Sequence, residues 1–173
     1  MGMDYKKMIK NSRLEAGKLM TEEQIAACNV AIHTAAVASG GAGFIPIPVA
    51  DAVPISVAQI AMVIALGKIF DQEISESAAK GIIGAAAATF VGRNLVKFIP
   101  IAGWIVSAGV AAGVTEAIGW SVAVDFAKSF RKEVNRRKSN QEAAEAQVEA
   151  KYYKNAAQAQ NPGSQEKAED FGE

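Results

Sequence analysis

Hydrophobic and polar positions divide the chain into an apolar middle and two polar ends. Residues 24 to 127 hold only ten charged side chains, and Ala/Gly-rich apolar runs fill most of that stretch. The phrase Phe-Ile-Pro-Ile occurs twice within it, at residues 44–47 and 98–101. Proline lacks an N–H and moves the preceding residue out of the α region, so each phrase predicts a turn between two helices. We therefore expect an all-α fold with two consecutive apolar helical hairpins.

The spacing of the two phrases indicates a duplicated unit. The two phrases are 54 residues apart, and the same offset aligns Asp71 with Asp125. Each aspartate lies near the end of the apolar stretch that follows its phrase. An acidic residue after the first phrase is also placed to cap the next helix. The residues expected to form the hairpin turns are Phe44, Pro46, Pro48, Asp51, Phe98 and Pro100.

The first 20 residues predict a separate basic amphipathic helix. Apolar positions between residues 3 and 20 follow helical spacing, and most of the remaining positions are basic. The basic residues are Lys6, Lys7, Lys10, Arg13 and Lys18. Such a helix can lie in a membrane interface, or it can be an ordinary surface helix packed on the core.

Capping signals set the other helix boundaries. Thr21 and Gln24 have capping-box spacing, and the helix that they begin should end near Ser39, before a run of glycines. The second helix should reach about residue 70, and Ser75 is placed to cap a third over about 76–97. The fourth begins near residue 102, and its polar continuation contains strong helix formers past residue 150, with a break near 139–140 as an alternative.

These boundaries predict four segments. They are a basic N-terminal helix (1–20), a duplicated helical-hairpin membrane domain (21–127), a polar cytoplasmic helix (128–160) and a disordered tail (161–173). The last helix of the second hairpin thus extends into the long polar helix.

The length and packing of the apolar helices favour insertion into a bilayer. A spanning helix needs about 20 apolar residues, which residues 101–124 supply, and the second and third helices nearly do. Trp104 and Trp120 are spaced to mark the two interfaces of one span. Small residues allow close helix packing in lipid. The predicted packing positions are Gly81, Gly84, Gly92, Gly109 and Gly113.

Charge predicts the topology and excludes some partners. Basic residues flank the apolar middle on both sides, which predicts a bacterial inner-membrane protein with both termini in the cytoplasm. Positive and negative charges balance, so no global field indicates a nucleic-acid partner. A soluble bundle remains an alternative, because Ala/Gly-rich helices also pack closely in water.

No catalytic constellation emerges from the residue types. The chain has one cysteine and one histidine, too few for a structural zinc site, and we expect no enzyme activity, cofactor or metal. His33 is expected as a buried polar contact between helices. Glu116 is an ionisable group deep in an apolar helix, which makes it a functional candidate or a buried hydrogen-bonding group.

Residues 46–62 also resemble a known domain family. Pro46, Pro48, Asp51, Gln59 and Met62 match the pattern of an uncharacterised bacterial family, and residues 99–103 match its second Ile-Pro turn. That family occurs after GTPase domains and in YcjF-type inner-membrane proteins. The resemblance covers residues 25–127 and implies a membrane-associated helical fold and a GTPase partner, although this chain has no GTPase domain itself.

Three functions follow as expectations. The leading one is a non-enzymatic, membrane-inserting, self-associating helical-hairpin scaffold, whose partners are the lipid bilayer and further copies of the chain. The second is a pore-forming or membrane-disrupting effector. The third is a soluble all-α assembly protein.

Overall fold

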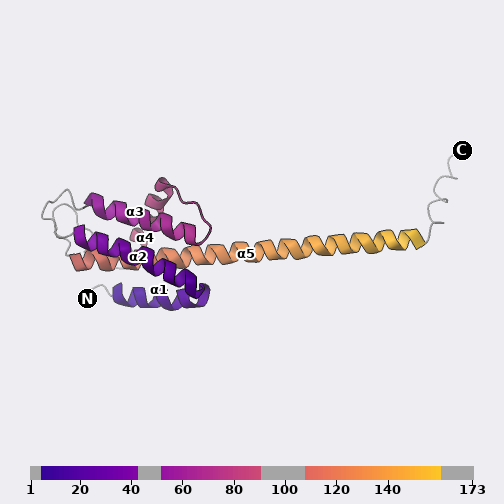
Figure 1. Ribbon diagram of the computed structural model, residues 1–173, viewed down its shortest axis with the longest axis horizontal. Helices are drawn as coiled ribbons and strands as arrows, with labels where there is room; N and C mark the ends of the chain where they lie inside the picture. Colours follow the sequence, from indigo (N-terminus) through magenta and orange to yellow (C-terminus); the bar gives the residue numbers. More distant parts are fainter. Residues whose placement is uncertain (1–4, 43–51, 91–107, 161–173) are drawn as a thin grey trace. The chain divides into compact units, whose positions relative to one another are not determined.

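The computed structural model describes residues 5–42, 52–90 and 108–160, and these are organised as five α-helices (Figure 1). The helices are α1 (Tyr5–Leu19), α2 (Glu22–Ala42), α3 (Ala52–Ile69), α4 (Glu76–Phe90) and α5 (Ala108–Gln160). The all-α prediction is confirmed over this part of the chain. Both proline phrases, with the predicted turn residues 44–51 and 98–100, lie outside the described residues.

The chain separates into two compact units, residues 1–131 and 132–173, and α5 runs through the boundary. In the first unit α2 packs on α3, α3 on α4, and α1 on α2. The first part of α5 is the central element, since nearly every position from Ala117 to Ala127 is buried. Helix burial on all sides requires apolar or small side chains around the whole circumference, which this stretch has.

The core joins all five helices. Its largest fully buried side chains are Trp120 from α5, Leu66 from α3, Phe70 from the turn that follows α3, and Ile32 from α2. Ala79 of α4 and Ala16 of α1 complete it. Phe70 also lies against Phe130, with ring centroids 6.2 Å apart. Small residues at many of these positions let the helices approach closely.

The start of α2 follows its capping signal. The Thr21 amide donates to Gln24 Oε1 (3.0 Å) and the Gln24 amide donates to Thr21 Oγ1 (3.2 Å), which is the predicted capping box. The predicted end near Ser39 is wrong, because α2 continues through two glycines to Ala42. Ser39 and Gly40 are buried, and tertiary packing overrides the low helix propensity of glycine there.

The end of α3 is a Schellman motif. The Gln72 amide donates to the Gly67 carbonyl (2.9 Å) and the Asp71 amide to the Lys68 carbonyl (3.3 Å). Asp71 has a φ of 55°, the left-handed conformation that this motif needs. Asp125, its counterpart in the predicted duplication, lies in the middle of α5. The two halves therefore differ at these ends.

The later helices agree with the prediction in part. The Ala78 amide donates to Ser75 Oγ (3.2 Å), so Ser75 caps α4 as expected. The break considered near residues 139–140 is absent, and α5 is continuous over 53 residues. Over the residues that the structure describes, no helix combines the length and the apolar character needed to cross a membrane.

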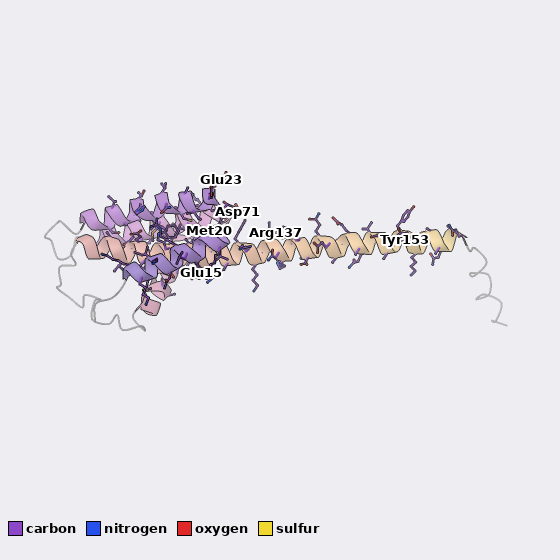
Figure 2. The ribbon with its side chains drawn as sticks, turned by 90° about the horizontal axis from the view of Figure 1, so that it is seen from below. Glu15, Met20, Glu23, Asp71, Arg137 and Tyr153 are labelled. Atoms are coloured by element: carbon purple, nitrogen blue, oxygen red, sulfur yellow. The ribbon has the colours of Figure 1, made fainter. Side chains whose placement is uncertain are left out.

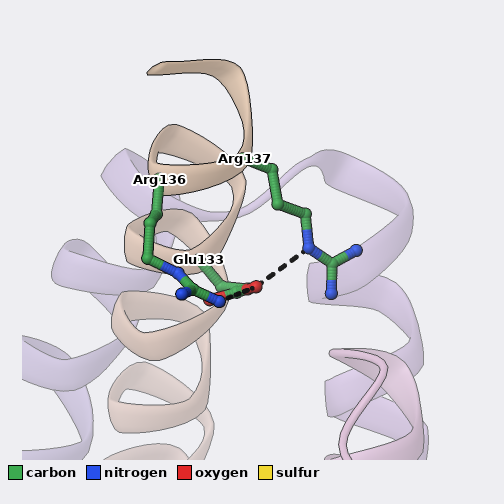
Figure 3. A network of polar contacts seen from close by, with 3 residues as sticks. All are labelled: Glu133, Arg136 and Arg137. Atoms are coloured by element: carbon green, nitrogen blue, oxygen red, sulfur yellow. Dashed lines mark hydrogen bonds and ion pairs between the residues drawn. The ribbon is translucent and has the colours of Figure 1, made fainter. Parts of the chain in front are cut away.

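Polar contacts along α5 stabilise its part of the second unit. Glu133 accepts hydrogen bonds from Arg136 (2.9 Å) and Arg137 (2.9 Å), one turn further along (Figure 3). Gln141 donates to Glu145 in the same i, i+4 arrangement (3.1 Å). Pairs at these spacings lie on one side of a helix and support the helical conformation.

Candidate functional site

The most unusual surface of the first unit is the outer side of α2 and α3. Val30 and Val37 of α2 are 69% and 73% exposed, and Val57 of α3 is 60% exposed. The exposed positions between Val30 and Val37 are His33 and Thr34. Exposed alanines lie before and after them on α2 and on α3, at Ala26, Ala27, Ala38 and Ala61. We call Val30, Val37 and Val57 the valine face.

Polar side chains lie inside the same unit. Thr115 is fully buried and accepts a hydrogen bond from Gln59 Nε2 of α3 (3.1 Å). Ser39 Oγ and Trp120 Nε1 are buried without a hydrogen-bond partner among the described residues. Gln72 of the α3–α4 turn donates to the Phe126 carbonyl of α5 (3.3 Å). The unit therefore places several polar groups inward and large apolar groups outward on α2 and α3.

Helix α1 packs on α2 and α5 through polar contacts. Arg13 donates to Asn29 Oδ1 (2.7 Å), and its guanidinium carbon lies 5.0 Å from the centre of the Trp120 ring. Glu15 pairs with Lys128 (2.7 Å), and Glu15 is labelled on α1 in Figure 2. The side-chain contact from Glu15 raises the pKa of Lys128. These contacts fix which side of α1 faces outward.

A shallow groove of about 510 Å³ lies between α1 and α5. Its lining residues are Lys6, Ile9, Lys10, Arg13, Leu14 and Glu116. Glu116 is therefore neither deep in a lipid-facing span nor fully buried, since it is half-buried beside cationic side chains. Leu14 stands 60% exposed in this basic surface. A rim of cations with an exposed leucine is the composition of an interfacial helix.

The other predicted site residues are dispersed. His33 is exposed on α2, so the prediction of a buried contact is wrong; the α2 face that packs carries Cys28 and Ile32 instead. Gly113 is buried in α5. Gly81 and Gly84 are exposed, and a Cβ added to either would meet no atom within 4 Å. Within one chain these two are therefore not packing positions, and Gly92 and the surroundings of Gly109 are outside the described residues.

Two glycines that the sequence did not single out are tightly packed. A Cβ on Gly119 would lie 2.8 Å from Ile32 Cγ1 and 2.8 Å from Met62 Sδ. A Cβ on Gly67 would lie 2.5 Å from Ile74 Cγ1 and 2.8 Å from the Gln72 carbonyl oxygen. Side chains of α2 and α3 lie against Gly119, and the turn after α3 lies against Gly67. Composition marks small residues, but it does not say which of them face another element.

Reactive chemistry is sparse in the described part of the chain. Cys28 is fully buried, and desolvation raises the pKa of its thiol to about 11, so it is not a thiolate nucleophile at neutral pH. The described residues hold no group of histidine, cysteine and carboxylate side chains able to bind a metal ion. The arrangement is one of surfaces and packing contacts.

The chain was compared with known proteins. No protein-family model, curated protein or solved structure matches the chain. The resemblance to the GTPase-associated family stays a prediction.

Proposed function

We propose that the protein is a non-enzymatic scaffold that inserts the α2–α3 side of its first unit into a lipid bilayer and self-associates. The observation that carries this proposal is that α2 and α3 hold large apolar side chains on their exposed as well as their buried sides. Ile32 and Leu66 are fully buried, while Val30, Val37 and Val57 are mostly exposed, with the exposed polar residues His33 and Thr34 between the first two valines. Large apolar side chains gathered on a surface are typical of a site that meets a partner or a membrane.

The interior supports the same conclusion. Polar side chains such as Gln59 and Thr115 bond between helices, and small residues allow close backbone approach. In lipid, helix association depends on these two features, because the surrounding acyl chains are as apolar as leucine. In this proposal the valine face contacts acyl chains, and insertion is partial because no described helix is suited to crossing.

Helix α1 has a complementary part in this proposal. Its basic side chains lie at the level of the headgroups, where each contributes about 1 kcal/mol of attraction to an anionic surface. Exposed Leu14 adds an apolar contact. The bacterial inner membrane, with both termini on the cytoplasmic side, is the compartment that the flanking basic residues favour. A GTPase partner rests on the family resemblance alone.

Flotation with vesicles containing anionic lipid tests this proposal. The wild-type chain should float with the vesicles, and Val30→Glu with Val37→Glu should reduce the floating fraction at least about tenfold, since charges at membrane depth cost several kcal/mol. Both side chains are exposed, so the core stays intact. The matched control is Asn135→Glu with Asn140→Glu, which adds the same charges at exposed positions of α5.

Equal flotation of the valine-face variant and the wild type would overturn the proposal. The proposal would also be overturned if the wild type were recovered from buffer without detergent and did not bind the vesicles. Circular dichroism of each variant should give the wild-type helical signal, which separates loss of binding from loss of folding. Release of a vesicle-entrapped dye at the concentrations that float would favour the membrane-disrupting effector instead.

A soluble all-α assembly protein is the second candidate, and one observation favours it. Trp120 is 1% exposed, with the Arg13 guanidinium over its ring, so it lies in a packed core and not at a lipid-facing interface as predicted. A cation–π contact between an exposed arginine and a buried tryptophan is ordinary in water-soluble bundles. The flotation experiment also decides between these two candidates.

A further inference from the structure

The described part of the second unit, residues 132–160 of α5, carries a stripe of two valines, a glutamine and a tyrosine. Val134, Gln141 and Val148 follow each other at intervals of seven, and Tyr152 comes four residues after Val148. Val148 and Tyr152 are each 70% exposed. We call these four residues the Val148 face. Seven-residue spacing keeps side chains on one side of a helix and is the pattern of helix pairing.

A groove lies along the Val148 face. It is shallow and largely apolar, has a volume of about 530 Å³, and is lined by Gln141, Ala144, Glu145, Val148, Glu149, Tyr152 and Tyr153. Tyr152 and Tyr153 meet edge to face, with centroids 5.8 Å apart. Figure 2 shows the Tyr153 side chain projecting outward from α5. The groove offers two aromatic rings and a valine to a partner.

Polar contacts within α5 stabilise this part of the helix but do not cover the Val148 face. Glu133 with Arg136 and Arg137, and Gln141 with Glu145, are contacts within the helix. They stabilise α5 without burying Val148 or Tyr152. A second helix with a matching stripe would remove these side chains from water.

We propose that the Val148 face binds the same face of a second copy in an antiparallel helix pair. This contact would supply the self-association of the proposed function, and the inference rests on that part of the proposal. It does not depend on membrane binding. In the register that we propose, the residue numbers of facing positions add to about 286. Val134 then faces the second copy's Tyr152, and Val148 packs beside the aliphatic stem of the second copy's Lys138.

Charge complementarity selects the antiparallel direction. Charges along this segment are grouped, with Arg136, Arg137 and Lys138 first and Glu142, Glu145 and Glu149 after them. In the antiparallel pair, Arg137 and Lys138 of each copy face Glu149 of the other. A parallel pair in register would instead place Lys138 beside Lys138 and Glu145 beside Glu145. Like charges at such positions oppose pairing and opposite charges favour it.

Sedimentation of the full chain in detergent-containing buffer over a range of concentrations tests the contact. We expect a dimer whose Kd rises at least about 100-fold with Val148→Lys, because each dimer loses two buried valines and gains two lysines facing Lys138. Gln147→Lys is the matched control, since it adds the same charge one residue away, about 100° around the helix from Val148. It should leave the Kd unchanged. A monomeric wild type, or a Val148→Lys chain that dimerises like the wild type, would overturn the proposal.

Cysteine crosslinking tests the direction. In a Cys28→Ala background, a Val134→Cys chain mixed with a Tyr152→Cys chain should form the mixed disulfide, and neither chain alone should form much. Disulfides between two identical chains at both positions would show parallel pairing and refute the antiparallel contact. Absence of every disulfide would refute the register.

A charge exchange gives an independent readout. Lys138 and Glu149 are eleven residues apart, or about 16 Å along one helix, so they do not pair within a chain. Lys138→Glu should weaken the dimer by about tenfold, and adding Glu149→Lys to the same chain should restore it. Lys154→Glu makes the same charge change on the opposite side of the helix and should have little effect. Failure of the second change to restore the dimer would contradict the charge pairing.

Discussion

Replacing Gly119 with alanine should destabilise the first unit, although alanine is the better helix former. Gly119 is buried on α5, where α2 and α3 both press on it. An added Cβ would lie 2.8 Å from Ile32 Cγ1 and 2.8 Å from Met62 Sδ, with Ile32 Cγ2 at 3.1 Å. Carbon atoms prefer separations of about 3.5–4.0 Å, so the neighbours must move.

The magnitude follows from two opposing terms. Alanine in place of glycine favours a helix by about 1 kcal/mol. Overpacking a core costs about 1–3 kcal/mol. Met62 can rotate away, but Ile32 is branched at Cβ and has few rotamers available in a helix. We therefore expect a net loss of about 1 kcal/mol for Gly119→Ala.

Urea unfolding followed by circular dichroism measures this effect, with Gly17→Ala as the control. A Cβ on exposed Gly17 meets nothing within 4 Å, so that change should stabilise by about 1 kcal/mol. In a Met62→Ala background the Gly119→Ala change should cost less, because the sulfur is no longer in the way. If Gly119→Ala raised the unfolding midpoint as much as Gly17→Ala does, the close packing of α5 against α2 and α3 would be refuted.

Further predictions concern the turn after α3 and the polar part of α5. Gly67→Ala should cost about 1–3 kcal/mol by overpacking, since its Cβ would meet Ile74 and a backbone carbonyl; an unchanged thermal midpoint would contradict this. Asp71→Gly should instead stabilise, by up to about 1 kcal/mol, because glycine adopts positive φ without strain. Hydrogen bonds, with that from Arg136 the strongest, lower the pKa of Glu133 to about 2. The stabilisation that ionised Glu133 gives the helix is thus present above about pH 4.5 and lost as the pH falls to about 2, and a Glu133→Gln chain should lose less helical signal over that interval.

Most of the helical order could be predicted from the sequence, because it depends on local chemistry. The capping box at Thr21 and the cap at Ser75 use side chains within three residues of the groups that they bond. The end of α2 could not be predicted in this way. Its glycines are helical because Ser39 and Gly40 are buried, and burial depends on elements distant in the sequence.

The candidate site was less predictable for the same reason. A glycine in a helix is a packing position when atoms of another element lie close to its Cα, and it is not one when it faces outward. Gly81 and Gly84 have helical spacing for a packing face, yet both are exposed, whereas a Cβ added to Gly119 or Gly67 would meet other atoms at less than 3 Å. His33 is likewise exposed, because the packed side of α2 runs through Cys28 and Ile32.

The continuity of α5 connects the two units energetically, however they are arranged. Starting a helix is the unfavourable step, and adding residues to an existing helix is close to neutral for strong helix formers. The packed stretch around Trp120 supplies the start, and the polar residues after Arg131 extend it. Destabilising the first unit should therefore also lower the helical order of residues 132–160. Hydrogen exchange of the Gly119→Ala chain should show faster exchange there, most near residue 132, whereas equal rates to the wild type would mean that the second unit forms its helix independently.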